Sequence, residues 1–191
     1  MGSINQANAS VWSDSEASQI VRRQQDTPFF FHIHVEERHT DIMVTVAVEP
    51  PSQVQKRTVL YPPLVVMSQT NQYAFYQVML VDSHGHAVES DILQGTLSAS
   101  PQPLEGAAGR GRSPRDFAVF PDLVISRSGT YTIQVNAYQI DFNSIPPTTL
   151  HAAAVATREI RVRSSPVSEE RPSSSESRML ARLSQGGFPI P

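Results

Sequence analysis

The sequence predicts a mostly β fold, an immunoglobulin-like antiparallel β-sandwich with a short C-terminal helix. The chain holds 15 prolines and 9 glycines in 191 residues, a proline excess typical of folds with many loops and few long helices. Short runs of β-type residues, several of them alternating apolar and polar, recur with proline or glycine between them, as in sandwich proteins. The length suits one ordinary domain with disordered ends.

Order is predicted to begin near Pro28. Residues 1–27 are rich in serine, glutamine and asparagine, and such a composition cannot bury enough apolar surface to fold, so we expect a disordered N-terminal arm. We assign residues 28–191 to one β-sandwich domain. Its first predicted strand covers residues 29–35. The second covers residues 42–48 and ends before Pro50-Pro51, because proline cannot donate a ladder hydrogen bond.

The rest of the sandwich is predicted from further runs of this kind. A loop is expected at residues 52–57, directly after the two prolines. The later strands follow from period-2 alternation or from continuous apolar runs. They cover residues 64–68, 73–81, 92–99, 117–126 with an interruption at Pro121, 131–140 and 155–163. Seven or eight short strands result, as a sandwich of two sheets requires.

Residues 100–116 are predicted to form a mobile loop. The stretch contains Gly-Ala-Ala-Gly at residues 106–109 and the arginines Arg110, Arg112 and Arg115. It carries too little apolar surface to offset the entropy of ordering it.

A short helix is predicted near residues 176–185. Methionine and leucine recur there at helical spacing, a capping-box pattern precedes them, and two glycines provide a stop. These residues are, in that order, Met179, Leu180 and Leu183; Ser173 and Glu176; and Gly186 and Gly187. So short a helix is marginal alone, and we expect its apolar stripe to dock on the sandwich.

The composition excludes several functional classes. The chain has no cysteine, which excludes disulfide scaffolds, cysteine-ligated zinc and thiol nucleophiles. Its formal net charge is −3, so any contact with nucleic acid must come from a local basic cluster. No apolar run reaches the roughly 18 residues of a membrane span, and the polar first residues predict no secretory signal.

No catalytic motif stands out. The sequence contains neither a Gly-x-Ser-x-Gly elbow nor a phosphate-binding glycine loop. His32, His34 and Glu36 would share one face of the first predicted strand, as metal ligands could, but a metal site needs converging partners from other elements. Outward-facing polar positions explain the pattern better. We therefore expect no enzyme, no metal, no cofactor and no small-molecule substrate, and a metal-dependent enzyme is only a remote alternative.

Basic residues gather in three places along the chain. Lysine occurs once among 15 basic residues. The three groups are Lys56 and Arg57; Arg110, Arg112 and Arg115; and Arg158, Arg161 and Arg163. Loops at one end of a sandwich can present such side chains jointly to a phosphate backbone. The competing explanation is that each group consists of ordinary solvated charges.

Five runs then occur in an order and spacing that matches a known family. They are Leu-Tyr-Pro-Pro-Leu-Val-Val at residues 60–66, Tyr-Ala-Phe-Tyr-Gln-Val-Met-Leu-Val-Asp at 73–82, Leu-Gln-Gly-Thr-Leu at 93–97, Phe-Ala-Val-Phe-Pro-Asp-Leu at 117–123 and Met-Leu-Ala-Arg-Leu-Ser-Gln-Gly at 179–186. The chain resembles the fungal velvet domain over about residues 42–190. The run at 117–123 and the ending are the most specific parts of the match.

The resemblance implies a fungal transcription regulator with a sandwich akin to the Rel homology domain. Velvet proteins form homo- or heterodimers with one another, bind double-stranded DNA and control sporulation, development and secondary metabolism. They move between cytoplasm and nucleus, and they are not enzymes. For this chain the DNA-binding candidates are Lys56, Arg57, Arg110, Arg112 and Arg115.

The chain departs from the family in the loop expected to grip phosphates. Velvet domains carry an arginine-rich loop with glycines before a proline segment. Here residues 48–57 precede Tyr61-Pro62-Pro63, and Lys56 and Arg57 are the only basic residues among them. An alternative function follows, in which the chain dimerises with another velvet protein and has lost most direct contact with DNA.

Overall fold

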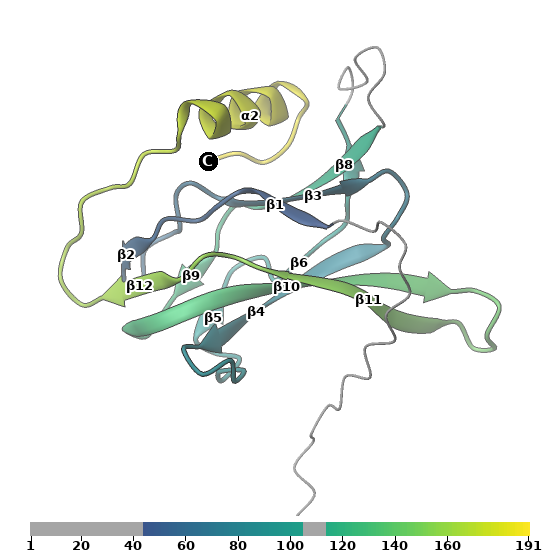
Figure 1. The fold of residues 1–191 in the computed structure, drawn as a ribbon, viewed down its shortest axis with the longest axis horizontal. Helices are drawn as coiled ribbons and strands as arrows, with labels where there is room; N and C mark the ends of the chain where they lie inside the picture. Colours follow the sequence, from purple (N-terminus) through teal and green to yellow (C-terminus); the bar gives the residue numbers. More distant parts are fainter. Residues whose placement is uncertain (1–43, 105–113) are drawn as a thin grey trace, which may run out of the picture. The chain divides into compact units, whose positions relative to one another are not determined.

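Two β-sheets form the sandwich in the computed structural model, which describes residues 44–104 and 114–191 (Figure 1). One sheet has the order β1 (Thr45–Val48), β3 (Leu64–Gln69), β8 (Arg115–Phe120) and β7 (Gln102–Pro103). The other has the order β2 (Gln53–Gln55), β12 (Ile160–Arg163), β10 (Gly129–Asp141), β4 (Phe75–Asp82) and β6 (Ser98–Ala99). The predicted mostly β fold with antiparallel sheets and a C-terminal helix is confirmed.

The longest hairpin extends the second sheet. β11 (Thr148–Ala156) pairs antiparallel with β10 from Asp141–Thr148 to Gln134–Ala156. β12 continues along the same side of β10, where it pairs with Gly129 to Tyr131. A two-stranded sheet of β5 (Leu93–Gln94) and β9 (Val124–Ile125) completes the strands of the described part.

The main core lies between the two large sheets, and period-2 alternation explains its composition. In β10, Tyr131, Ile133, Val135 and Ala137 are buried, as their spacing predicts. In β12, Ile160 and Val162 are buried while Arg161 and Arg163 are exposed. The alternation therefore determines which face of this sheet meets the core.

The first sheet is buried on both of its faces, because the helix covers the outer one. Val66 and Phe120 point into the main core, whereas Val65 and Phe117 belong to a second apolar cluster with the C-terminal helix. Continuous apolar runs such as Leu-Val-Val-Met in β3 are the sequence signature of a strand buried on two faces.

The helix α2 (Ser174–Gln185) begins two residues earlier than predicted and is capped as predicted. The Ser173 hydroxyl accepts a hydrogen bond from the Glu176 amide, and a Glu176 carboxylate oxygen accepts one from the Ser173 amide at 2.8 Å. Leu180 and Leu183 are buried against the sheet, so the expected docking of the apolar stripe is confirmed. In the described residues no helix is long and apolar enough to cross a membrane.

Three predicted boundaries were wrong. The loop expected at 52–57 contains strand β2, because Val54 is buried and the segment pairs in parallel with β12. The strand expected at 92–99 is broken into β5 and β6, because Gly95 adopts φ +106. The strand expected at 155–163 is two strands, β11 and β12, and β11 starts at Thr148.

The stretch 100–116, predicted as a mobile loop, is partly sheet. Gln102 and Pro103 form β7 on the edge of β8, and Arg115 and Asp116 belong to β8 itself. Asp116 is buried and accepts a hydrogen bond from the Asn71 amide at 2.8 Å, which ties this end of β8 to the sandwich. Residues 105–113 lie outside the described part, as do the predicted N-terminal arm and the strand expected at 29–35.

Candidate nucleic-acid interface

The edge formed by β2 and β12 gathers basic side chains. The two strands run parallel, with Arg161 opposite Gln53 and Arg163 opposite Gln55. Val54 and Val162 between them are buried. Because side chains alternate along a strand, Arg161 and Arg163 face solvent on the outer side of the sheet.

The turn after β2 brings Lys56 and Arg57 to the same edge. The Lys56 amide donates to the Arg163 carbonyl at 2.8 Å, and the Arg57 amide donates to the Ile125 carbonyl at 2.9 Å. Arg57 has φ +63, a left-handed conformation that is uncommon for a residue with a side chain. The two hydrogen bonds hold that turn in place. We call Lys56, Arg57, Arg161 and Arg163 the basic edge.

Acidic neighbours weaken the positive field only slightly. Glu159 approaches Arg161 at 3.9 Å, and both side chains are more than half exposed. Solvent screens such an exposed pair, so its interaction free energy is small and Arg161 remains available to a phosphate.

Arg158 belongs to the same group along the sequence as Arg161 and Arg163, but its side chain is held by contacts within the fold. Its guanidinium donates to the Pro50 carbonyl at 2.8 Å and forms an ion pair with Glu170. Although partial burial opposes the effect, hydrogen bonds from Ser52 and Arg158 keep the pKa of Glu170 below its ordinary value. Arg158 therefore anchors the C-terminal segment, and we exclude it from the basic edge.

Arg115 lies far from the basic edge. It pairs with Gln69 at one end of the β3–β8 ladder, whereas Leu64 pairs with Phe120 at the other end. β8 is six residues long, so its ends are about 17 Å apart. Arg57 bonds to Ile125, which follows the far end of β8. Arg110 and Arg112 lie outside the described residues, so the structure joins Lys56 to Arg57 but not to Arg115.

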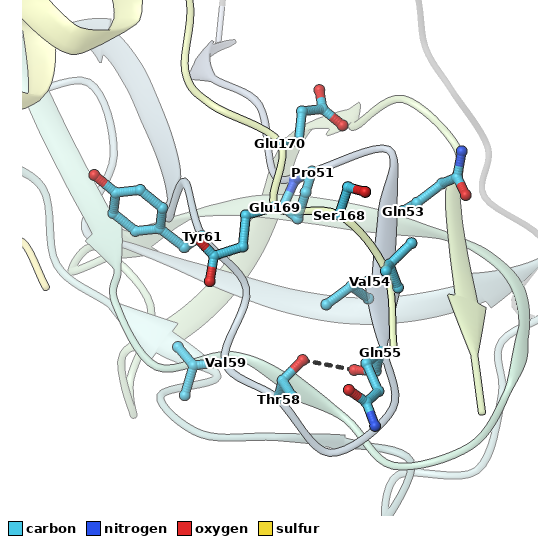
Figure 2. Close-up of a pocket in the computed structure, with 11 residues that line it drawn as sticks. Pro51, Gln53, Val54, Gln55, Thr58, Val59, Tyr61, Ser168, Glu169 and Glu170 are labelled. Atoms are coloured by element: carbon cyan, nitrogen blue, oxygen red, sulfur yellow. Dashed lines mark hydrogen bonds between the residues drawn. The ribbon is translucent and has the colours of Figure 1, made fainter. Parts of the chain in front are cut away.

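A pocket of about 290 Å³ lies on the other side of β2, against the segment that leads to α2 (Figure 2). Its apolar wall includes Val54, Val59 and Tyr61, and its rim carries the carboxylates of Glu169 and Glu170. The remaining lining residues are Pro51, Gln53, Gln55, Thr58, Val167 and Ser168. Glu170 is paired with Arg158, and the carboxylate of Glu169 disfavours a phosphate, so we do not count this pocket with the basic edge.

Histidine and acidic residues form no metal-binding group within residues 44–104 and 114–191. His84 and His86 flank a turn in which Asp82 accepts both of their amides, at 2.8 and 2.9 Å. The bond from the His86 amide is the main reason that the pKa of Asp82 is lowered. This aspartate therefore shapes a turn. His32, His34 and Glu36 lie outside the described residues.

Comparison with known proteins adds no family assignment. The chain matches no protein-family model, and it matches no curated protein.

Proposed function

We propose that this protein is a velvet-type transcription regulator, which dimerises and binds double-stranded DNA to control fungal development, sporulation and secondary metabolism. The proposal places it in the nucleus, with a cytoplasmic pool, and gives it no enzymatic activity and no cofactor. Two lines of argument support it: the family-like runs of the sequence, and the convergence of Lys56 with two arginines of β12.

The convergence at the basic edge is the observation that carries the proposal. Lys56 and Arg163 are 107 positions apart in sequence, yet one backbone hydrogen bond of 2.8 Å joins them. Guanidinium groups suit phosphate because their planar N–H donors match two oxygens at once. Arg161 and Arg163 stand on a paired strand, so little backbone ordering would be needed when DNA binds.

The basic edge would supply affinity more than sequence recognition. Contacts to phosphate fix the position and orientation of a protein on DNA, while contacts to base edges select the sequence. Four cations that each neutralise one phosphate give a plot of log K against log salt with a slope of about −3.6.

A protein-interaction subunit is the second candidate. The short basic loop, in which Lys56 and Arg57 are the only cations of residues 48–57, and the formal net charge of −3 favour it, because both weaken the attraction for a polyanion. In this case the chain would bind a velvet partner that contacts the DNA. The DNA affinity of the heterodimer would then not depend on Lys56 or Arg57.

Fluorescence anisotropy over a salt series tests the proposal. Lys56→Ala/Arg57→Ala should weaken binding to every duplex sequence and reduce the salt slope by about 1.8 units. The control is Arg178→Ala, which removes a positive charge from an exposed position on α2, outside the basic edge. A folded chain that binds no duplex at low salt, or a double variant with an unchanged slope, would remove the basic edge from the proposal and favour the interaction subunit.

A further inference from the structure

The outer face of β4, β10 and β11 is almost free of charge. These three strands carry only two charged residues, Asp82 and Asp141, and each is the last residue of its strand. A sheet face that meets water normally carries lysine, glutamate and arginine among its polar residues. Depletion of charge is instead the compositional mark of an interface core.

The side chains on this face form a connected array. Phe75 and Tyr138 stack with ring centroids 4.9 Å apart, and Tyr138 meets the His151 ring edge-on at 5.6 Å. Asn136 is only 7% exposed and accepts hydrogen bonds from Gln134 at 3.0 Å and, at 3.3 Å, from the His151 ring. These contacts already restrict the rotamers of the side chains on this face in the free protein, so fewer rotamers are lost when a partner binds and the entropy cost of binding is lower.

The hairpin that joins β10 to β11 extends the face with exposed apolar side chains. Ile140 is 38% exposed and lies in phase with Tyr138 on this face, and Phe142 and Ile145 at the tip are 76% and 99% exposed. Leu150 pairs with Gln139 and therefore lies on the opposite side of the hairpin. In Figure 1 this hairpin projects beyond the rest of the described sheet, at the end opposite to β2 and β12. So much apolar surface on one hairpin marks an interaction site.

The free edge of β11 supports the same conclusion. β11 pairs with β10 on one side and with no other strand of the described part. Its sequence, Thr-Thr-Leu-His-Ala-Ala-Ala-Val-Ala, contains no lysine, no proline and no acidic residue. Monomeric proteins usually protect an edge of this length with such residues.

We infer that the outer face of β4, β10 and β11, together with the tip of their hairpin, is the surface on which a second copy of this chain packs. We call it the neutral face. The inference rests on the dimerisation part of the proposed function and assigns it a location. Two copies would meet sheet to sheet about a two-fold axis.

A second copy fits this surface for two reasons. An uncharged surface pairs with itself without like-charge repulsion, and it offers nothing to select a strongly charged partner. Three strands about 4.8 Å apart and about 35 Å long present roughly 500 Å² in projection, and the side chains of the tip bring the area near the ~800 Å² per partner of a standard interface.

The basic edge borders the start of β10, and the apolar tip of the neutral face lies at the other end of that strand. Arg161 pairs with Thr130 at the start of β10, whereas Ile140, next to the tip, lies ten residues further along that strand, about 33 Å away. A dimer centred on the tip and on the adjoining half of the neutral face would carry one basic edge on each copy, away from the contact between the copies.

Analytical ultracentrifugation of the full chain over a concentration series tests the inference. Gln77→Lys places a charge on the neutral face beside Asn136, and a two-fold axis buries that charge twice, so the dimer Kd should rise at least about tenfold. Phe142→Ser/Ile145→Ser, at exposed positions that do not disturb the core, should weaken the dimer as well. Gln185→Lys on exposed α2 is the matched control and should leave the dimer Kd unchanged.

Two outcomes would overturn the inference: a chain that stays monomeric up to about 100 μM, far above the Kd of a standard interface, or a dimer that neither variant weakens. The Lys56→Ala/Arg57→Ala variant should dimerise like the wild type. Loss of DNA binding can therefore be told apart from loss of the interface.

Discussion

Gly95 shows how one residue redirects a strand. Its φ of +106 is a conformation that side chains rarely adopt, and a Cβ at this position would collide with the backbone carbonyl of Asp122. The neighbouring Thr96 amide donates to the Asp122 carboxylate at 2.8 Å. The chain therefore leaves β5 at Gly95 and re-enters a different sheet as β6.

Gly95→Ala should destabilise the protein by about 2–4 kcal/mol, because strain at a positive φ adds to a clash with backbone that cannot move away. Gly85→Ala separates the two effects, since Gly85 has φ +81 but a Cβ added there would have no atom within 4 Å, and it should cost about 1–2 kcal/mol. Urea unfolding of both variants measures the free energies. Equal losses would show that the contact with Asp122 contributes nothing.

At the scale of elements, α2 covers the outer face of the first sheet and shields it from solvent. Its buried residues Leu180 and Leu183 join Val65, Phe117 and Val119 in the second apolar cluster. The capping box and the hydrogen bond from the Gly186 amide to the Arg182 carbonyl, at 3.0 Å, define both ends of the helix. Docking then stabilises a helix that would be marginal alone.

Leu183→Ala should lower the free energy of unfolding by about 2–4 kcal/mol, because Leu183 is fully buried between helix and sheet. Ser184→Ala changes the adjacent exposed residue and should stay within about 0.5 kcal/mol of the wild type. Thermal or urea unfolding followed by circular dichroism measures both. A loss below about 1 kcal/mol for Leu183→Ala would mean that α2 does not pack as described.

At the scale of the whole molecule, the sequence predicted the elements whose local pattern agrees with their tertiary environment. The alternation in β10 and the apolar run in β8 both predicted strands that the structure contains. β11 was largely missed, because alanine and threonine give it no clear periodicity and its strand conformation comes from pairing with β10.

The candidate site was predicted in part for a related reason. Lys56 and Arg57 could be identified from local sequence, since two basic residues stood in a stretch poor in charge. Their approach to Arg161 and Arg163 depends on a parallel pairing of β2 with β12. The alternation Gln-Val-Gln at residues 53–55 was the only local signal of β2, and three residues are too few for a reliable pattern.

Hydrogen bonds and one ion pair between residues far apart in the sequence join the C-terminal segment to the sandwich. Glu170 accepts from the Ser52 amide and hydroxyl, both at 2.7 Å, and pairs with Arg158. Glu176 accepts from the Glu49 amide at 3.3 Å. Burial opposes the effect, yet hydrogen bonds lower the pKa of both Glu170 and Glu176, whereas burial raises the pKa of Glu49.

These shifts predict acid sensitivity. A carboxyl group whose pKa is lower in the folded state stabilises the fold above its unfolded pKa of 4.5, and that stability is lost as the pH falls through the folded pKa. Glu170→Gln should therefore cost about 1 kcal/mol at pH 7, and this difference from the wild type should shrink progressively as the pH falls below 4.5. Glu159→Gln, at a position 59% exposed, should follow the wild type throughout. Urea unfolding at a series of pH values gives the three curves, and parallel curves for Glu170→Gln and the wild type would contradict the assigned role of Glu170.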